Sequence, residues 1–274
     1  MKGNAMKRMP TDILTIAVLA GAVFVAPAAA DEPSARDIME KNFHVTKIKH
    51  LLNDSTMTLT NDKGQQRIRK THSVNLLQPN GIDSKIMIRF LQPGDVEGTG
   101  YLQVQHYDGD DDMWIYLPAL KKVRRLIANN KKDSFVGSDF SYGDILQPVV
   151  DTYKHTILKS ESLDGEDCWV IESVPASEQI KKDYGYGKKT SWIRKNNFME
   201  KKIEFLDAAG RPLKTMTVQE IVEVDAANHK WWALKREVKN LQTGHSTFLT
   251  FEHLDTKKPV GDDFFTTRYL EREK

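Results

Sequence analysis

The eight histidines are the side chains in this sequence that most readily act as general bases or metal ligands. A metal or catalytic site needs two or three such groups close together, usually at a fixed spacing. No pair of histidines shows H-x-H, H-x-x-x-H or H-E-x-x-H spacing. We therefore interpret them as dispersed surface or core residues: His44, His50, His72, His106, His155, His229, His245 and His253.

An acidic run at residues 108–112 (DGDDD) has a spacing that resembles a calcium loop. Asp108, Asp110 and Asp112 match the first three ligand positions of an EF-hand. The next position should be glycine and is Met113, and no glutamate follows at the twelfth position. A charged turn between two strands is the better interpretation, so we predict no metal site.

Motifs for nucleophilic catalysis and phosphate binding are missing from the sequence. No serine lies in a G-x-S-x-G or S-x-x-K motif. The glycine-rich residues 94–100 (GDVEGTG) lack the Lys-Ser/Thr of a phosphate loop and precede a strand rather than a helix. The single cysteine, Cys168, lies in a strand-like apolar run and is typical of a small buried residue. Because Ser, His and Asp are all common here, composition leaves a catalytic triad open, but no residue is singled out for one. We expect no cofactor.

A basic cluster follows the second of two strand-like segments. It comprises Lys121, Lys122, Arg124 and Arg125, with Lys131 and Lys132 nearby. The usual explanation is a solvated strand end and loop, and the more specific one is a docking patch for an acidic partner or lipid headgroups. Because side chains alternate along a strand, the first four cannot all share one face.

The elements that must position these groups are mostly strands. An amphipathic helix is predicted over residues 34–44, with Ser34 as its N-cap. From residue 54 onward, polar and apolar residues alternate between turn signals at intervals typical of an antiparallel meander. The expected strands are 55–60, 66–77, 84–90, 101–107, 113–117, 155–163, 167–173, 190–194, 199–206, 214–224, 231–240 and 246–254.

Two segments interrupt the strand pattern. Residues 128–151 have no strand period and could form short helical turns capped by Ser138 or Asp139. Residues 175–189 are rich in charge and contain two glycines. Long loops in a compact domain are usually functional or mobile. Since no repeat or linker divides the chain, we expect a single domain over 31–274.

The N-terminus has the pattern of a secretory signal peptide. Lys2, Lys7 and Arg8 precede an apolar run that is too short to span a bilayer. Ala28 and Ala30 then occupy the small-residue positions of a cleavage site. We expect residues 1–30 to be removed before Asp31, which gives a soluble periplasmic product.

The charge balance argues against nucleic acid as a partner. The whole chain carries 40 Lys and Arg against 38 Asp and Glu, and removal of the leader leaves the two signs balanced. Binding to nucleic acid needs a strong basic surplus on some face. A balanced chain also has no general attraction to anionic membranes, and we do not expect an integral membrane protein.

The residues from 90 to 145 contain a series of motifs in a fixed order: Phe90, Pro93 and residues 98–102 (GTGYL), 112–120 (DMWIYLPAL), 123–125 (VRR) and 134–142 (SFVGSDFSY). In these motifs the chain resembles the LolA-like family of exported outer-membrane lipoprotein-sorting proteins. The order and spacing of these motifs are similar to those in the subgroup often found beside RND-type membrane exporters. The leader, the N-terminal helix and the long meander agree with it, so the resemblance extends over the mature chain.

The resemblance implies a mainly β fold. This fold is a curved, incomplete antiparallel β-barrel whose open face is closed by an N-terminal helix and short helices. It also implies a periplasmic carrier that binds the acyl chains of a lipoprotein or lipid, without enzyme activity, and passes them between membrane partners. A non-carrier accessory subunit that docks on an inner-membrane RND-type exporter is the first alternative. An exported β-rich hydrolase is the weakest.

An acyl chain needs a dry apolar cavity, because each buried methylene contributes roughly 0.8 kcal/mol. The apolar faces of the expected strands supply candidate lining residues, although alternation alone does not distinguish a cavity wall from a packed core. These candidates are Met57, Leu59, Ile86, Ile88, Phe90, Leu102, Val104, Trp114, Tyr116, Met216 and Val218.

Overall fold

The computed structural model describes residues 1–3 and 32–272. Contacts divide the chain into two units, Met1–Glu32 and Pro33–Lys274, and the second unit contains the folded domain. The expected signal peptide and its cleavage before Asp31 lie outside the described residues, apart from residues 1–3. Within the described residues, no helix has both the length and the apolar character needed to cross a membrane.

Thirteen strands account for most of the second unit. The first half contains α1 (Ala35–Val45), β1 (His50–Thr60), β2 (Gln66–Leu77), β3 (Ser84–Gln92), β4 (Gly100–Gln105), β5 (Asp112–Leu117), η1 (Pro118–Leu120), β6 (Lys122–Leu126), η2 (Ala128–Lys132), η3 (Phe135–Gly137), α2 (Tyr142–Ile145) and η4 (Val150–Thr152). The second half contains β7 (Tyr153–Leu163), β8 (Glu166–Pro175), α3 (Glu178–Tyr184), β9 (Tyr186–Arg194), β10 (Glu200–Asp207), β11 (Pro212–Asp225), η5 (Ala226–Asn228), β12 (Lys230–Asn240), β13 (Ser246–Asp255), η6 (Asp262–Phe264) and α4 (Thr267–Leu270).

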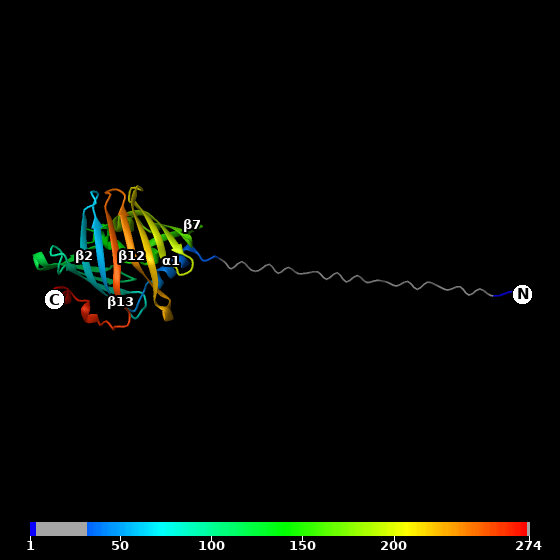
Figure 1. Ribbon diagram of the computed structural model, residues 1–274, viewed down its shortest axis with the longest axis horizontal. Helices are drawn as coiled ribbons and strands as arrows, with labels where there is room; N and C mark the ends of the chain where they lie inside the picture. The colour runs from blue at the N-terminus through cyan, green and yellow to red at the C-terminus, as the bar shows by residue number, and fades with distance from the viewer. Residues whose placement is uncertain (4–31, 273–274) are drawn as a thin grey trace. The chain divides into compact units, whose positions relative to one another are not determined.

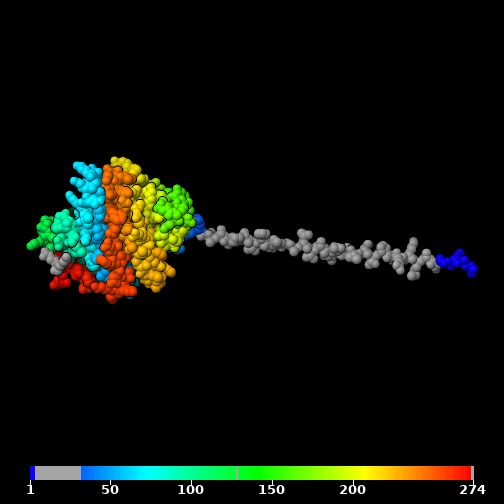
Figure 2. Space-filling model, in the orientation of Figure 1, coloured from blue at the N-terminus to red at the C-terminus, as the bar shows by residue number. Residues whose placement is uncertain are grey.

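All thirteen strands belong to one curved antiparallel sheet that does not close into a barrel. Their order is β6-β5-β4-β3-β2-β1-β13-β12-β11-β10-β9-β8-β7. Each neighbour in this order is also a neighbour in sequence, except that β1 pairs with β13. Figures 1 and 2 show the first strands, in cyan, beside the last, in orange. The predicted half-barrel fold is therefore confirmed.

The sheet buries side chains on both faces. Alternate residues such as Met57, Phe90 and Met216 form the inner face, which carries the largest core cluster. The opposite, outer face carries a second cluster that includes Met87, Leu102 and the C-terminal Leu270. Where both faces of a sheet are covered, successive residues of a strand are apolar in turn on each face. The alternation of polar and apolar residues is therefore weakest in the strands that contact both clusters.

The N-terminal helix α1 packs against the β7 to β9 end of the sheet. Ser34 caps it, since its Oγ accepts from the Asp37 amide at 3.1 Å while the Asp37 carboxylate accepts from the Ser34 backbone N–H. The buried helix residues Ala35 and Ile38 contact a cluster that contains Ile171. The predicted helix and its cap are confirmed.

The segment from residue 127 to residue 152 joins the two edge strands β6 and β7, and we call it the lid. Its aromatic residues pack onto the inner face: the rings of Phe135 and Tyr142 lie 5.3 Å and 5.5 Å from that of Tyr101 on β4. Ser141 precedes the lid helix α2 and caps it, since its Oγ accepts from the Asp144 amide at 3.1 Å. The cap is therefore Ser141, not Ser138 or Asp139.

The lid is also fastened by the acidic turn before β5. Lys131 Nζ donates to Asp111 Oδ2 at 2.8 Å, and both side chains are nearly buried. Asp112 pairs instead with Arg125 on the neighbouring strand β6. These aspartates thus have structural partners in the fold, which agrees with the interpretation of residues 108–112 as a charged turn.

Candidate functional site

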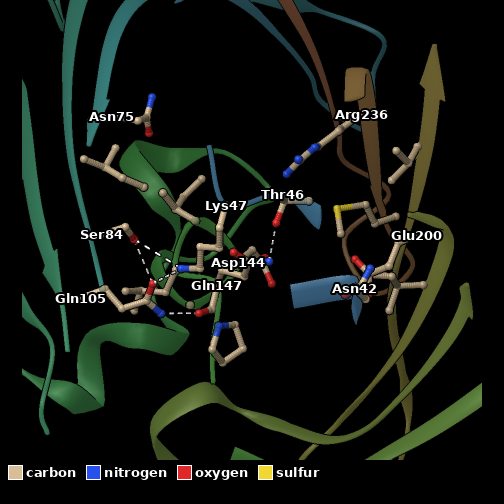
Figure 3. A pocket seen from close by; sticks show the side chains of 18 of the residues that line it. Asn42, Thr46, Lys47, Asn75, Ser84, Gln105, Asp144, Gln147, Glu200 and Arg236 are labelled. Atoms are coloured by element: carbon tan, nitrogen blue, oxygen red, sulfur yellow. Dashed lines mark hydrogen bonds between the residues drawn. The ribbon is translucent and has the colours of Figure 1, made fainter. Parts of the chain in front are cut away.

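A cavity of about 240 Å³ lies between the inner face of the sheet, the end of α1 and the lid. The lid contributes residues 143–148, while β3 and β4 form one wall and β9 to β12 form the other. Figure 3 shows side chains from α1, β3, β4, the lid, β10 and β12 converging on the cavity. Its apolar lining includes Ile86, Leu146, Ile203, Phe205, Met216 and Val218.

The wall near α1 and β4 is polar. Lys47, just after α1, donates from Nζ to Gln105 Oε1 at 2.8 Å and lies 3.5 Å from Ser84 Oγ (Figure 3). Gln147 of the lid donates from Nε2 to Thr46 Oγ1 at 2.6 Å, which ties the lid to the end of the helix. Burial lowers the pKa of Lys47 to about 8, and the charges of Asp83 and Asp111 oppose this shift.

The opposite wall carries three charged groups from three strands: Lys189 of β9, Glu200 of β10 and Arg236 of β12. Burial raises the pKa of Glu200 and lowers the pKa of Lys189 to about 8. Lys189 Nζ lies 3.7 Å from the centre of the Tyr153 ring. Arg236 lies over the rings of Trp232 and Phe251 and reaches from β12 toward the middle of the cavity (Figure 3).

A buried ion pair anchors the lid to the sheet. Lys214 Nζ of β11 lies 2.5 Å from Asp144 Oδ2 of the lid and donates to the Asp139 carbonyl at 3.0 Å. Tyr186 donates from its hydroxyl to Asp144 Oδ1 at 2.7 Å. Burial works to raise the pKa of Asp144, but the ammonium of Lys214 outweighs it and the pKa is lowered.

The structure divides the predicted lining residues into three groups. Ile86, Met216 and Val218 line the cavity. A second group lies in or against the packed core of the inner face, outside the cavity lining: Met57, Leu59, Ile88 and Phe90. The third group belongs to the outer-face cluster, and its assignment to the cavity is wrong: Leu102, Val104, Trp114 and Tyr116.

The error on β4 and β5 has a physical reason. On β4 the prediction took the more apolar face, with Leu102 and Val104. On β5 both faces are apolar, and the prediction took the face of Trp114 and Tyr116. The C-terminal segment covers these faces through Val260, Phe265 and Leu270. The inner face of β4 carries Tyr101, Gln103 and Gln105, and its two glutamines line the cavity. Because side chains alternate between the two faces of a sheet, an error in the choice of face places every side chain of the strand on the wrong side.

The basic cluster lies on β6 and the turn before it, at the edge of the sheet. Lys121, Lys122, Arg124 and Arg125 are all exposed. Arg125 lies opposite Trp114 and Arg124 opposite Ile115, so the two arginines project from different faces, as predicted. In the described structure neither arginine pairs with Asp139 or Asp144 of the lid: Asp144 pairs with Lys214, and Asp139 accepts from Thr247.

Five polar residues of the cavity were missed: Lys47, Gln103, Lys189, Glu200 and Arg236. In the sequence, the charged residues among them are indistinguishable from the solvated charges of an exposed strand face. Lys189 lies opposite Phe205, and Arg236 lies opposite Val218. This register could have indicated a common face, but only after the strand pairing was known.

Replacing Lys47 with methionine should stabilise the protein at pH 7 by about 1–3 kcal/mol, because the buried ammonium costs more than its contacts return. The folded-state pKa of about 8 lies below the usual 10.5, so wild-type stability rises as the pH increases from about 8 to 10.5. The difference in free energy of unfolding between Lys47→Met and the wild type should therefore shrink as the pH rises from about 8 to 10.5.

Urea unfolding at pH 7 and pH 9.5 measures this difference, with Lys49→Met as the exposed control. If Lys47→Met were less stable than the wild type at pH 7, the buried ammonium would be a net stabilising group. The burial argument would then be wrong.

The curved open sheet and the lid over part of its inner face define the class of incomplete-barrel folds. A family model described as "Uncharacterized protein" matches residues 82–272. An outer membrane lipoprotein-sorting protein domain from Vibrio parahaemolyticus is 31% identical, with a TM-score of 0.79 over 87% of this chain and 98% of that one. This protein belongs to the LolA-like family of outer-membrane lipoprotein-sorting proteins.

Two further solved structures agree with this membership. A DUF1329 family protein from Desulfovibrio piger is 26% identical, with a TM-score of 0.79 over 86% of this chain and 97% of that one. A LolA superfamily protein from Nitrosomonas europaea is 19% identical, with a TM-score of 0.68 over 87% of this chain and 100% of that one, and it shows the shared fold. No curated protein sequence matches significantly.

Proposed function

We propose that this protein is a periplasmic carrier that binds acyl chains of a lipoprotein or lipid in the cavity beneath the lid and passes them between membrane partners. The observation that carries the proposal is a partly open cavity on the inner face with apolar side chains from both walls and from the lid. Carrying needs no bond to be made or broken, so we propose no enzyme activity.

The size of the cavity indicates how such a ligand enters. Pockets for drug-sized ligands usually measure about 300–1,000 Å³, and this cavity of about 240 Å³ is smaller. A long acyl chain therefore requires the lid to move away from the inner face. Each methylene that enters contributes roughly 0.8 kcal/mol, which offsets part of the lid contacts that are lost.

Native mass spectrometry of the protein purified from its own periplasm, followed by lipid extraction, tests the proposal. We expect a bound species that releases a lipid or an acylated peptide on extraction. Purification from the periplasm with an N-terminus at Asp31 tests the localisation in the same sample. A protein that is free of ligand and does not take up acyl probes would refute the carrier role.

The exposed basic cluster on β6 supports a second part of the proposal, docking on an acidic surface of an inner-membrane transporter of the RND type. An ordinary reason for charges there is protection of an edge strand from aggregation. The two explanations differ in their effect on the association rate with the transporter. Charges at the rim of a docking interface accelerate association, whereas charges that only protect an edge strand have no effect on it.

Reversing both Arg124 and Arg125 to glutamate should slow transfer of ligand to the membrane partner by about tenfold at low salt, and the loss should shrink as salt rises. Transfer rates at several salt concentrations measure it, and reversal of Lys63 and Lys70, which are exposed on the β1–β2 hairpin, is the control. A large fall in melting temperature with an emptied cavity would identify a structural role instead.

A stable complex with the transporter that never contains ligand would favour the accessory-subunit alternative. The observation that favours this alternative is the same basic cluster, which docking requires and carrying does not. Lipid extraction from the isolated complex distinguishes the two functions, because only a carrier is recovered in both ligand-bound and ligand-free forms.

A further inference from the structure

The charged groups of the cavity do not balance. Among the described lining residues, three are cations, Lys47, Lys189 and Arg236, and two are anions, Asp144 and Glu200. Asp144 is already neutralised by Lys214. Three cations therefore face one remaining carboxylate in a largely enclosed space, where an uncompensated charge is costly.

Hydrogen-bond donors are also in surplus. Gln103 is fully buried, and its Nε2 has no hydrogen-bond partner among the described residues. The indole Nε1 of Trp232 and the Nε of Arg236 are likewise buried without an acceptor in the described part of the chain. All three side chains line the cavity. Buried donors normally have an acceptor, and this set has none among the described residues. A ligand oxygen can provide one after the lid has moved, a movement that entry of a long chain also requires.

The one carboxylate left on this wall does not supply the missing acceptor. Glu200 accepts from Ser191 Oγ at 3.2 Å, and no ion pair within 4.0 Å joins it to Lys189 or Arg236 in the described structure. Its charge influences both cations from a distance. Arg236 projects into the cavity with its guanidinium toward the centre (Figure 3).

We infer that the cavity selects acyl ligands that end in an anionic, hydrogen-bond-accepting headgroup, a carboxylate or a phosphate. Arg236 and Lys189 supply the positive charge, and Gln103 and Trp232 supply further donors. The apolar lining from Ile86, Met216 and Leu146 receives the chain. This inference rests on the proposed carrier function and names the class of ligand for the same cavity.

Three probes distinguish the contribution of the acyl chain to binding from that of the headgroup: laurate, 1-dodecanol and acetate. Laurate and dodecanol have the same chain length and differ in charge, whereas acetate has the charge without the chain. We expect wild-type protein to bind laurate at least about tenfold more tightly than dodecanol in calorimetric titrations, since a charge-assisted hydrogen bond contributes this much or more. Acetate should bind far more weakly than either.

Arg236→Gln and Lys189→Gln should each weaken laurate binding by about tenfold and leave dodecanol binding unchanged. Lys235→Gln is the matched control, because Lys235 is the next residue of β12 and pairs with Glu220 outside the cavity lining. Each variant is first compared with the wild type by circular dichroism.

A pH series on the wild type tests the inference without any substitution. Lys47 and Lys189 lose protons as the pH passes about 8, so the preference for laurate should decline between pH 7 and pH 9.5. The charged groups around Lys189 are Glu200, Asp144 and Lys214, and those around Lys47 are Asp83 and Asp111. Laurate keeps its charge throughout, since carboxylates titrate near pH 4.

The outcomes distinguish this inference from the function on which it rests. Equal affinity for laurate and dodecanol would overturn the headgroup preference and leave the carrier role intact. Binding of neither probe would overturn both proposals. Acetate affinity equal to that of laurate would identify a site for small free anions and would overturn the preference for acyl ligands. A laurate preference that survives in both glutamine variants and at pH 9.5 would also overturn the inference.

Discussion

Replacing Lys214 with methionine should lower the free energy of unfolding by about 3–5 kcal/mol. Lys214 and Asp144 are both almost completely buried and lie 2.5 Å apart. The substitution leaves Asp144 with hydrogen bonds from Tyr186 and from the Ser141 amide, but without the cation that holds its pKa low. A lone buried carboxylate is far more costly than a paired one.

The pH dependence of this variant has a definite sign. The folded-state pKa of Asp144 is lowered in the wild type, so the pair contributes stability above the usual carboxyl pKa and loses it as the pH falls. The difference between wild type and Lys214→Met should therefore narrow in acid. Urea unfolding at pH 7 and pH 4 measures it.

Two further variants sharpen the test of the buried pair. Lys235→Met breaks the more exposed pair with Glu220 and should change stability by less than about 1 kcal/mol. Lys214→Met combined with Asp144→Asn should recover part of the loss, because no charge is left unpaired. Equal losses in Lys214→Met and Lys235→Met would show that burial of the pair has no energetic consequence.

Replacing Leu146 with alanine should cost about 2–5 kcal/mol of stability and also change the preferred chain length of the ligand. Leu146 is buried in the lid and lines the cavity, so the smaller side chain enlarges the space available. Myristate has two more methylenes than laurate, and burying both is worth about tenfold or more in affinity. We expect the ratio of myristate to laurate affinity to rise by that factor.

Leu102→Ala is the matched control for chain length. Leu102 is as buried as Leu146 but belongs to the outer-face cluster. It should lose similar stability with no change in the ratio of the two affinities. A parallel change in both variants would mean that the ratio reports general loosening of the sheet and not the volume of the cavity.

Much of the architecture could be predicted from alternation and turn residues. Twelve of the strands were predicted, and β6 was missed because KVRRL offers only two apolar residues among its five. The helix α3 was missed because residues 175–189 were interpreted as an interruption, although Ser177 caps the helix and Gly185 ends it in the left-handed conformation.

The candidate site was harder to predict than the fold. An apolar cavity was expected, and the structure adds cations on two opposite walls, Lys47 on one and Lys189 and Arg236 on the other. Side chains of this kind are usually solvated, so composition gave no reason to place them inside. Their burial follows from strand register and from the lid, both of which depend on contacts between residues far apart in the sequence.

The pairing of the first strand with the last has a consequence for the order of folding. Every other ladder joins sequence neighbours, so each half of the sheet can form by adding hairpins one at a time. The β1–β13 ladder closes a loop that contains almost the whole domain, and loop closure over such a length slows folding. Until β13 is synthesised, β1 has an unpaired edge, which is a template for aggregation. A chaperone that binds the newly made chain would therefore protect it most at the stage before its last strand is available.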